Sequence, residues 1–437
     1  MKKTFLIIFA LALFGSMLAE TSAGSLGWDD RGYLVFESED GNFKTRFDTR
    51  IYINGSYFLD DPEEILSNQT NLRKARFAIK TQLWKYWAFE WDIDVADGDI
   101  VEVKDMWVSY SGFKNSQLKF GNFKQPFGLE EITSSRLLTF PERAMAMLAF
   151  ETDRQFGLEY SKWGTLGKIP FNLRSSVYTQ ALSNEAKSDY EKEVDETGTG
   201  AAVRFVVAPQ INDDFLFHGG LSFVYDTPFD ESETMDFKSE AETKNGDLEW
   251  LDTDKIKEVD YALRYGFEGI LQYKNFHFQG EYVMANVIRL EESTAGDAAF
   301  DGGYAYLSWI PTGEKRPWSM VDGEFGQVMP KNKKTGAWEL AARYSYLSLT
   351  DEDAELSSGS GRAILGGGAN IYTFGLNWYA NPNVKFQLAY SMVDLNVNAN
   401  SEGDYIYIYL DEDDNTLNRY PDGYDFNYLQ FMTILYF

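Results

Sequence analysis

The chain contains no cysteine and only two histidines, His218 and His277, among its 437 residues. The absence of cysteine excludes disulfides, thiolate chemistry and a lipid anchor on a cysteine. Two histidines leave little for a histidine metal cluster or for a nucleophile that a histidine activates. Basic residues are also scarce, since 40 Lys and Arg stand against 68 Asp and Glu, a formal net charge of -28. Because such a charge repels nucleic acid, we expect no nucleic-acid partner. From the scarcity of cysteine and histidine we also expect no cofactor, no metal site and no catalytic site.

Long apolar runs are missing beyond the first residues. Met1, Lys2 and Lys3 precede an apolar run that ends near residue 18, and small residues follow at 19–23. This is the pattern of a secretory signal, so we expect residues 1–23 to be removed and residues 24–437 to form one domain. No later run of 18 apolar residues occurs, and the mature chain therefore has no candidate membrane helix. A membrane role would need a β-barrel, which the 16% aromatic content also favours.

Strict alternation of apolar and polar residues is what the chain has in abundance. Residues 42–58 alternate with period two, and an apolar face with Phe43, Phe47 and Ile51 opposes a face of Lys44, Arg46, Asp48, Arg50, Tyr52 and Asn54. Such a strand of about 17 residues is longer than the 9–11 that cross a membrane at a tilt. Residues 74–83 and 87–96 repeat the alternation. A soluble sandwich would turn the apolar face to its core and a membrane barrel would turn it to lipid, so alternation alone does not choose between them.

The lengths of the connections distinguish a membrane barrel from a soluble sandwich. Short joins at residues 84–86, 112–116, 164–169, 209–213, 274–275 and 380–383 alternate with long ones at 59–71, 125–153, 182–198, 227–259, 351–368 and 397–423. Short turns on one side and long loops on the other are typical of outer-membrane barrels. The pattern predicts an all-β, antiparallel transmembrane barrel of about 16 strands. The join at 311–335 is an exception, because it is long where a short turn is expected.

The long connection at residues 125–153 is unusual in composition as well as length. Loops beyond about 12–15 residues are usually functional or disordered. This one holds too many apolar residues to be disordered, including the run from Met145 to Phe150. A loop that must pack against something inside an all-strand chain predicts a segment folded into the barrel lumen, where it sets the width and charge of a pore.

Several blocks of sequence resemble the phosphate-selective porins O and P. They include Leu72-Arg73-Lys74-Ala75-Arg76, Leu118 to Phe123, Phe127-Gly128-Leu129-Glu130, Thr133-Ser134-Ser135 and Pro141-Glu142-Arg143-Ala144. The resemblance implies a 16-stranded barrel, a homotrimer, and a third long loop folded inward. It also places Arg50, Arg73 and Lys74 on a basic inner face and Ser134 at the constriction. By parity, Arg73 falls on the other face from Lys74 and must sit at a rim or a bend if it contacts solute.

The chain departs from this family at two places. Glu131 stands where the phosphate-selective members carry a lysine, and Met392 and Asp394 stand where they carry basic residues near the end of the fifteenth strand. In a narrow passage, a unit charge about 4 Å away is worth roughly 4 kcal/mol at an effective dielectric of 20, so these differences could reverse ion preference.

The residues expected to line the pore are charged side chains of the first three strands together with polar residues of the long third loop. Basic residues on the first two strands and acidic residues on the third would create a transverse field that orients solutes. The alternative interpretation is that these groups only solvate the wall and pair with their neighbours. The set comprises Arg46, Asp48, Arg50, Arg73, Lys74, Arg76, Lys80, Glu90, Asp92, Asp94, Glu130, Glu131, Ser134 and Arg136.

These features predict an outer-membrane porin of a Gram-negative bacterium that lets small hydrophilic solutes or inorganic ions diffuse through a water-filled barrel. Its expected surroundings are outer-membrane lipid and lipopolysaccharide. A phosphate- or anion-selective channel is the alternative within the pore class. A surface adhesin or receptor that uses the acidic loop at 227–259 is the alternative outside it, while an enzyme is poorly supplied with catalytic groups.

Overall fold

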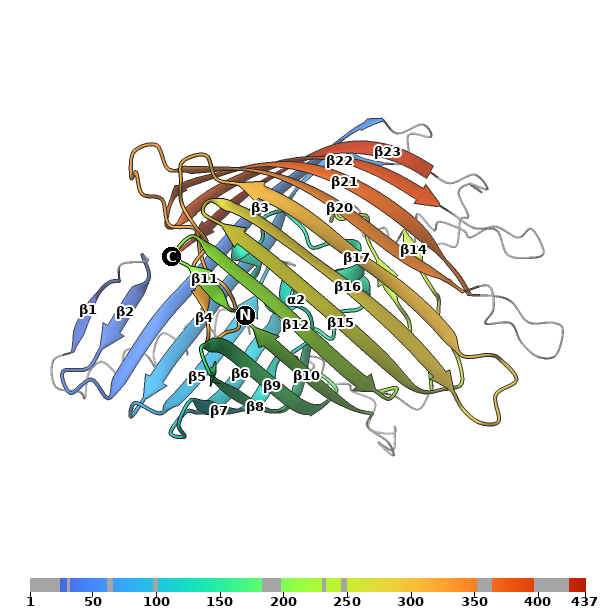
Figure 1. The fold of residues 1–437 in the computed structure, drawn as a ribbon, viewed down its shortest axis with the longest axis horizontal. Coiled ribbons are helices and arrows are strands. Elements are labelled where there is room, and N and C mark those ends of the chain that lie inside the picture. Colours follow the sequence, from blue (N-terminus) through green and yellow to red (C-terminus); the bar gives the residue numbers. More distant parts are fainter. Residues whose placement is uncertain are drawn as a thin grey trace, which may run out of the picture.

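The computed structural model describes residues 24–29, 32–60, 66–96, 101–182, 198–229, 233–244, 250–351, 364–396 and 424–437. The expected signal at 1–23 lies outside these residues. Sixteen strands of the described chain pair with their sequence neighbours, all antiparallel, and β23 (Tyr424–Tyr436) closes the ring onto β3 (Phe43–Asp60) (Figure 1). The predicted strand number is therefore confirmed. The other ring strands are β4 (Gln69–Leu83), β5 (Trp87–Asp94), β6 (Glu102–Tyr110), β7 (Ser116–Lys124), β8 (Arg154–Leu166), β9 (Ile169–Thr179), β10 (Thr199–Val207), β12 (Phe215–Asp226), β15 (Val259–Tyr273), β16 (Phe276–Arg289), β17 (Ala298–Trp309), β20 (Ala337–Asp351), β21 (Ile364–Asn381) and β22 (Val384–Asn396).

Short strands supplement the ring. The hairpin of β1 (Ser25–Trp28) and β2 (Leu34–Glu37) pairs onto the start of β3 and projects from the barrel in Figure 1, and β11 (Gln210–Asn212) adds to β12. Two small ribbons lie in connections, β13 (Lys238–Ser239) with β14 (Leu251–Asp252), and β18 (Trp318–Ser319) with β19 (Glu324–Phe325). Among the described residues, no helix has the length and apolar character needed to cross a membrane.

The ring exposes large apolar side chains and buries charged ones, which is the reverse of a soluble sandwich. Large apolar side chains such as Phe276, Phe278 and Phe374 are exposed, whereas Glu90 and Asp92 on β5 are buried. Because the ring is closed, its buried face is the inner one, and the apolar face is left for lipid. The alternation that the sequence left ambiguous is therefore that of a membrane barrel.

The connections alternate between the two ends of the barrel, as antiparallel pairing of neighbours requires. We call the end with the short joins the turn end and the other the loop end. The exception predicted from the sequence is present: residues 311–335 join β17 to β20 at the turn end and carry β18 and β19. We call this connection the turn-end segment.

Residues 125–153, which join β7 to β8 at the loop end, form the third loop. It contains α2 (Leu129–Ile132), a 3-10 turn (Ser135–Leu137) and α3 (Met145–Ala149). Its backbone is held by side chains of the buried face of distant strands. Glu281 of β16 accepts the N–H groups of Leu129 at 2.6 Å and Glu130 at 2.7 Å, and Lys385 of β22 donates to the carbonyl of Leu138 at 2.5 Å.

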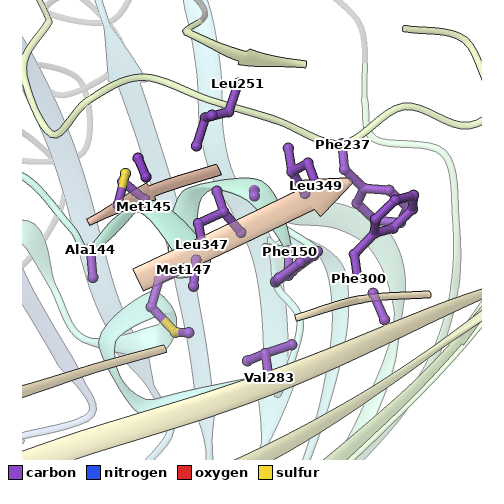
Figure 2. Packing of buried hydrophobic residues seen from close by; sticks show 14 of the residues in the cluster. Ala144, Met145, Met147, Phe150, Phe237, Leu251, Val283, Phe300, Leu347 and Leu349 are labelled. Atoms are coloured by element: carbon purple, nitrogen blue, oxygen red, sulfur yellow. The ribbon is translucent and has the colours of Figure 1, made fainter. Parts of the chain in front are cut away.

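Apolar packing holds the third loop on the same side. Figure 2 shows Met145, Met147 and Phe150 of the loop among Val283 of β16, Leu347 and Leu349 of β20, and residues of the connection from β12 to β15. These side chains belong to one cluster of buried apolar residues, and α3 contacts β16, β17 and β20. The third loop thus packs against the strands from β15 to β22.

The acidic connection at 227–259 is partly buried, unlike the exposed surface that an adhesin would use. Phe237, Ala241 and Leu251 are buried in the same cluster. Glu242 accepts the N–H of Met145 at 3.2 Å and also pairs with Arg343 of β20. The described part of this connection therefore covers the third loop from the loop end.

Replacing Phe150 by Ala should destabilise the barrel, because the Phe150 ring is buried and packs edge-on against Phe237 at 5.6 Å. We expect a loss of about 3–5 kcal/mol in the free energy of unfolding. Urea unfolding in detergent micelles measures it. Phe113→Ala is the matched control, because Phe113 is 53% exposed and its removal should leave the midpoint nearly unchanged. Equal midpoints for the two variants would show that the third loop is not packed as described.

Candidate functional site

A polar cavity of about 560 Å³ lies on the side of the ring that the third loop leaves open. Its walls come from β3 to β9 and from the facing edge of the third loop, and Lys244 of the connection from β12 to β15 and Glu324 of β19 complete the lining. Ten of its lining side chains are residues singled out above or their loop neighbours: Arg50, Arg73, Lys74, Arg76, Lys80, Glu90, Asp92, Ser134, Glu142 and Arg143.

A β-bulge on β4 brings two consecutive basic residues to this cavity. Lys74 pairs with Tyr52 and Leu72 pairs with Ile53, so Arg73 has no partner in the register. An extra residue at a bulge resets the alternation, which lets both side chains reach the inner face. The bend considered for Arg73 from sequence parity is this bulge. The Arg73 guanidinium then donates to the carboxylate of Glu142 in the third loop at 2.6 and 3.1 Å.

Lys74 differs from its neighbours because its side-chain nitrogen has no carboxylate partner among the described residues. Its ammonium nitrogen lies 5.5 Å from the centre of the Tyr52 ring. Within the described part of the chain no carboxylate oxygen lies within 4.0 Å of that nitrogen, although Lys74 is only 8% exposed. A side-chain nitrogen that lines the cavity without a carboxylate partner is available to an entering anion.

The acidic residues of β5 lie beside the basic residues of β4 and do not face them across the lumen. The register places Arg76 opposite Asp94 and Lys80 opposite Glu90 on neighbouring strands. Arg76 donates to Asp94 at 2.9 Å, and Lys80 also pairs with Glu90. Directly opposite side chains in an antiparallel pair are about 5 Å apart, so they pair before they can create a field across the pore. For these residues the structure supports the interpretation of neighbour pairing.

A second charged group surrounds Tyr33 and shares Arg50 with the cavity, whereas its other members, Arg46, Asp48 and Arg136, do not line the cavity. Asp48 lies 2.9 Å from Arg50, 3.6 Å from Arg46 and 3.8 Å from Arg136. The guanidinium carbons of Arg46 and Arg136 lie 4.5 and 5.5 Å from the centre of the Tyr33 ring. Asp48 therefore anchors basic residues of β3 and of the third loop to each other.

The structure places Glu130 and Glu131 away from the lining of the cavity. Glu131 lies 3.0 Å from Lys124 and 3.3 Å from Arg143. Burial alone would raise the pKa of Glu131, but these two cations outweigh burial and hold that pKa at about 2. Glu130 accepts the N–H of Ala144 at 2.9 Å, and burial raises its pKa. Both carboxylates point into the packed body of the loop, so neither presents a free negative charge to the passage.

Met392 and Asp394, the second place where the chain departs from the family, also do not line the passage. On β22 the buried positions are the odd-numbered ones, and Asp394 is exposed. Asp394 pairs in register with Asn370 on one side and Asp425 on the other, and like Met392 it belongs to the outward face. The expectation that Asp394 adds negative charge to the lumen is therefore wrong, because strand parity turns it outside.

The lining of the cavity is basic, in contrast to the whole chain. Twelve Lys and Arg side chains and eight Asp and Glu side chains line it. One of these acids, Glu151, has its pKa raised well above the ordinary value by burial and then by the charge of Glu131, which reduces its negative charge near neutral pH. The formal positive excess of the lining is four charges, twelve basic groups less eight acidic ones.

Sequence reasoning missed much of this basic lining. The residues come from β6 to β9, whose alternation was not followed to the side-chain level. Strand parity carried through these four strands would have found most of them. They are Lys104, Lys119, Lys124, Arg154 and Arg174, and the acidic Asp105 lies among them.

Three carboxylates of the cavity could together hold a metal ion, because oxygens of Glu90, Asp92 and Asp105 lie within 4.8 Å of one another. Each already has a basic partner, however. Asp105 accepts two hydrogen bonds from Arg154 at 2.8 and 3.0 Å, Asp92 lies 3.9 Å from Arg50, and Glu90 pairs with Lys80. A cation here would have to displace these groups, so the cluster acts as an acceptor for the basic lining.

Comparison with known proteins agrees with this geometry. The family described as phosphate-selective porin O and P matches residues 51–437. Porin O of Pseudomonas aeruginosa is 25% identical over 411 residues, which cover 87% of this chain and 91% of that protein.

Solved structures show the same fold at low sequence identity. OmpT of Vibrio cholerae in its trimer form is 10% identical, with a TM-score of 0.50 over 90% of this chain and 99% of that one. An anion-selective porin from Comamonas acidovorans is 11% identical, with a TM-score of 0.50 over 90% of this chain and 100% of that one. The family match spans most of the chain, and the ring and its cavity are those of a pore. The chain therefore belongs to the phosphate-selective porin O and P family and is a channel of the Gram-negative outer membrane.

Proposed function

We propose that this porin lets small hydrophilic solutes diffuse across the outer membrane with a preference for anions, inorganic phosphate among them. The observation that carries the proposal is the basic cavity, with twelve basic and eight acidic lining groups in a chain whose net charge is -28. Low-dielectric walls focus the field of such a lining, so the local concentration of anions rises relative to bulk water. The side-chain nitrogen of Lys74, which has no carboxylate partner among the described residues, is the group that we expect a passing anion to meet directly.

The third loop would narrow the passage. Its packing against the strands from β15 to β22 leaves water on the side of β3 to β9, and Ser134, Glu142 and Arg143 face this water. Glu131 and Asp394, the two acids that the sequence sets against an anion preference, do not oppose it in the structure. Lys124 and Arg143 neutralise Glu131, and Asp394 faces outward.

Four further features belong to the proposal. We expect a homotrimer, for which the trimer form of the similar OmpT gives a precedent, and we expect contacts with outer-membrane lipid and lipopolysaccharide. We also expect residues 1–23 to be removed as a signal peptide, and we propose no catalytic step. The adhesin alternative loses support because the described part of its expected loop is buried against the third loop.

Replacing Lys74 by Ala should lower the anion preference. Removing the unpaired cation changes the energy of an ion in the cavity, and across screened water the ratio of anion to cation permeability should fall about threefold to tenfold. The reversal potential of a planar bilayer across a KCl gradient measures this ratio. Added phosphate should reduce the chloride current of the wild type, and Lys74→Ala should relieve that block.

Lys44→Ala is the matched control, because Lys44 lies on the same strand as Arg50 but outside the cavity, half exposed and paired with Glu37. It should leave the reversal potential unchanged. A cation-selective wild type that phosphate does not affect would refute the anion preference. A purified protein that raises no conductance at all would refute the channel itself and favour the adhesin.

Replacing Glu131 by Gln should raise the anion preference at neutral pH, because Lys124 and Arg143 lose their counter-ion. It should also lower the free energy of unfolding by roughly 2 kcal/mol, less than the 3–5 kcal/mol of a fully dry pair, since both cations keep some contact with water.

The pH dependence of that loss follows from the lowered pKa of Glu131. The carboxylate stabilises the fold above its ordinary pKa of 4.5, and this contribution disappears as the pH falls through about 2. Urea unfolding of wild type and variant should therefore differ by a constant amount between pH 7 and 5 and converge near pH 2. A difference that persists at pH 2 would show that the pair is not the source of the loss.

A further inference from the structure

The turn-end segment enters the ring below the third loop. Arg316 donates to Glu339 of β20 at 2.6 Å and to Thr139 of the third loop at 2.8 Å. Trp318 donates through its indole N–H to the Nδ1 of His218 on β12 at 3.1 Å. The segment is therefore attached both to the wall and to the loop that forms the basic cavity.

The tip of this segment reaches the side of the ring that holds the passage. The carbonyl of Gly323 accepts from Arg204 of β10 at 2.9 Å, and Asn172 of β9 donates to the carbonyl of Val321 at 2.8 Å. These contacts hold residues 321–323 against β9 and β10.

Asp322 and Glu324 line a second cavity of about 120 Å³ that adjoins the basic one. Four side chains line both cavities, namely Lys119, Ile132, Arg174 and Glu324. The two cavities therefore meet at Glu324, on the side of the basic cavity towards the turn end. A solute that crosses the barrel on this side passes the two carboxylates.

The fold of the described chain leaves one oxygen of the Glu324 carboxylate without a donor. Its Oε2 atom is buried and accepts no hydrogen bond from the described residues. Asp322 is exposed to the cavity and accepts one hydrogen bond, from Ser319 at 2.6 Å. Burying a carboxylate oxygen without a donor is costly, so a structural role does not account for Glu324.

We propose that Asp322 and Glu324 form an acidic second constriction that limits the anion preference set by the basic cavity. This inference rests on the proposed function, because it concerns the selectivity of the same passage. An anion leaving the basic cavity meets two negative groups opposite Lys119 and Arg174, whereas a cation is favoured there. The pair thus reduces the preference of the channel for anions over cations. Asp322 and Glu324 act on this preference through their charge and do not bind the solute.

The charge of Glu324 changes near neutral pH. Burial, and then the charge of Asp322, raise its pKa to about 7 against the opposing effects of Arg204, Arg174 and Lys124. Above this pH Glu324 is charged and anions are hindered; below it Glu324 is neutral and the hindrance weakens. Lys119 and Glu159, which lie 3.5 Å apart, are the remaining charged groups that line the second cavity, and Glu159 also lies 2.6 Å from Arg174.

The test compares reversal potentials of wild type, Glu324→Gln and Asp322→Asn in planar bilayers across a KCl gradient. We expect each variant to raise the ratio of anion to cation permeability about twofold to fivefold, as the loss of one charge across screened water should. The difference between wild type and Glu324→Gln should be largest at pH 9 and vanish at pH 5. Asp322→Asn alters only an exposed side chain, so it remains informative if Glu324→Gln does not fold.

Asp213→Asn is the matched control, because Asp213 is exposed in a short turn at the same end of the barrel and lines neither cavity. Its reversal potential should equal that of the wild type. If the wild type prefers anions and neither Asp322→Asn nor Glu324→Gln changes the ratio, the second constriction is refuted and the proposed function stands. If the wild type does not prefer anions but both variants shift the ratio towards anions, the constriction stands and the proposed function fails.

Discussion

The structure depends on satisfying the backbone of a long loop that is buried against side chains of the barrel strands. Peptide N–H and C=O groups that leave water need partners, and a loop without regular structure cannot supply them itself. The wall does so with polar side chains on its inner face. Glu281 accepts from two N–H groups of the third loop, Asn377 and Gln387 donate to the carbonyl of Thr139, and Lys385 donates to that of Leu138.

This requirement divides the barrel into two unlike halves. The strands from β15 to β22 use their inner faces to bind the third loop, through hydrogen bonds and through the cluster around Met147 and Phe150. The strands from β3 to β9 are left with inner faces that meet water, and their charges either pair with the adjacent strand or line the cavity. A chain with a strong negative charge can therefore contain a basic passage, since much of its acid is paired or lies elsewhere.

The sequence was sufficient for the ring. Period-two alternation and the lengths of the joins predict the strand number, the two ends and the exceptional connection at 311–335, because these features are local. The membrane interpretation also follows, although alternation alone could not reach it. The entry of the third loop into the lumen stays a prediction that the described contacts support.

The site was less predictable, because the effect of a charge depends on its partner. The charge of Glu131 is balanced by Lys124 and Arg143, which come close to it only when the loop folds. The sequence alone therefore could not show that Glu131 adds no free negative charge. Asp394 was assigned to the lumen by analogy, whereas parity along β22 would have placed it outside. The extra residue at Arg73 leaves no mark in the pattern, since a bulge is defined by the register with the neighbouring strand.

That bulge has a consequence for how densely a strand can carry charge. In a regular strand, side chains on one face are separated by two residues, about 7 Å, whereas two consecutive residues are about 3.8 Å apart at their Cα atoms. By letting Arg73 and Lys74 share a face, β4 concentrates two cations at one level of the wall. A barrel can thus sharpen its electrostatic profile along the axis by the insertion of a single residue, with no change in strand number or diameter.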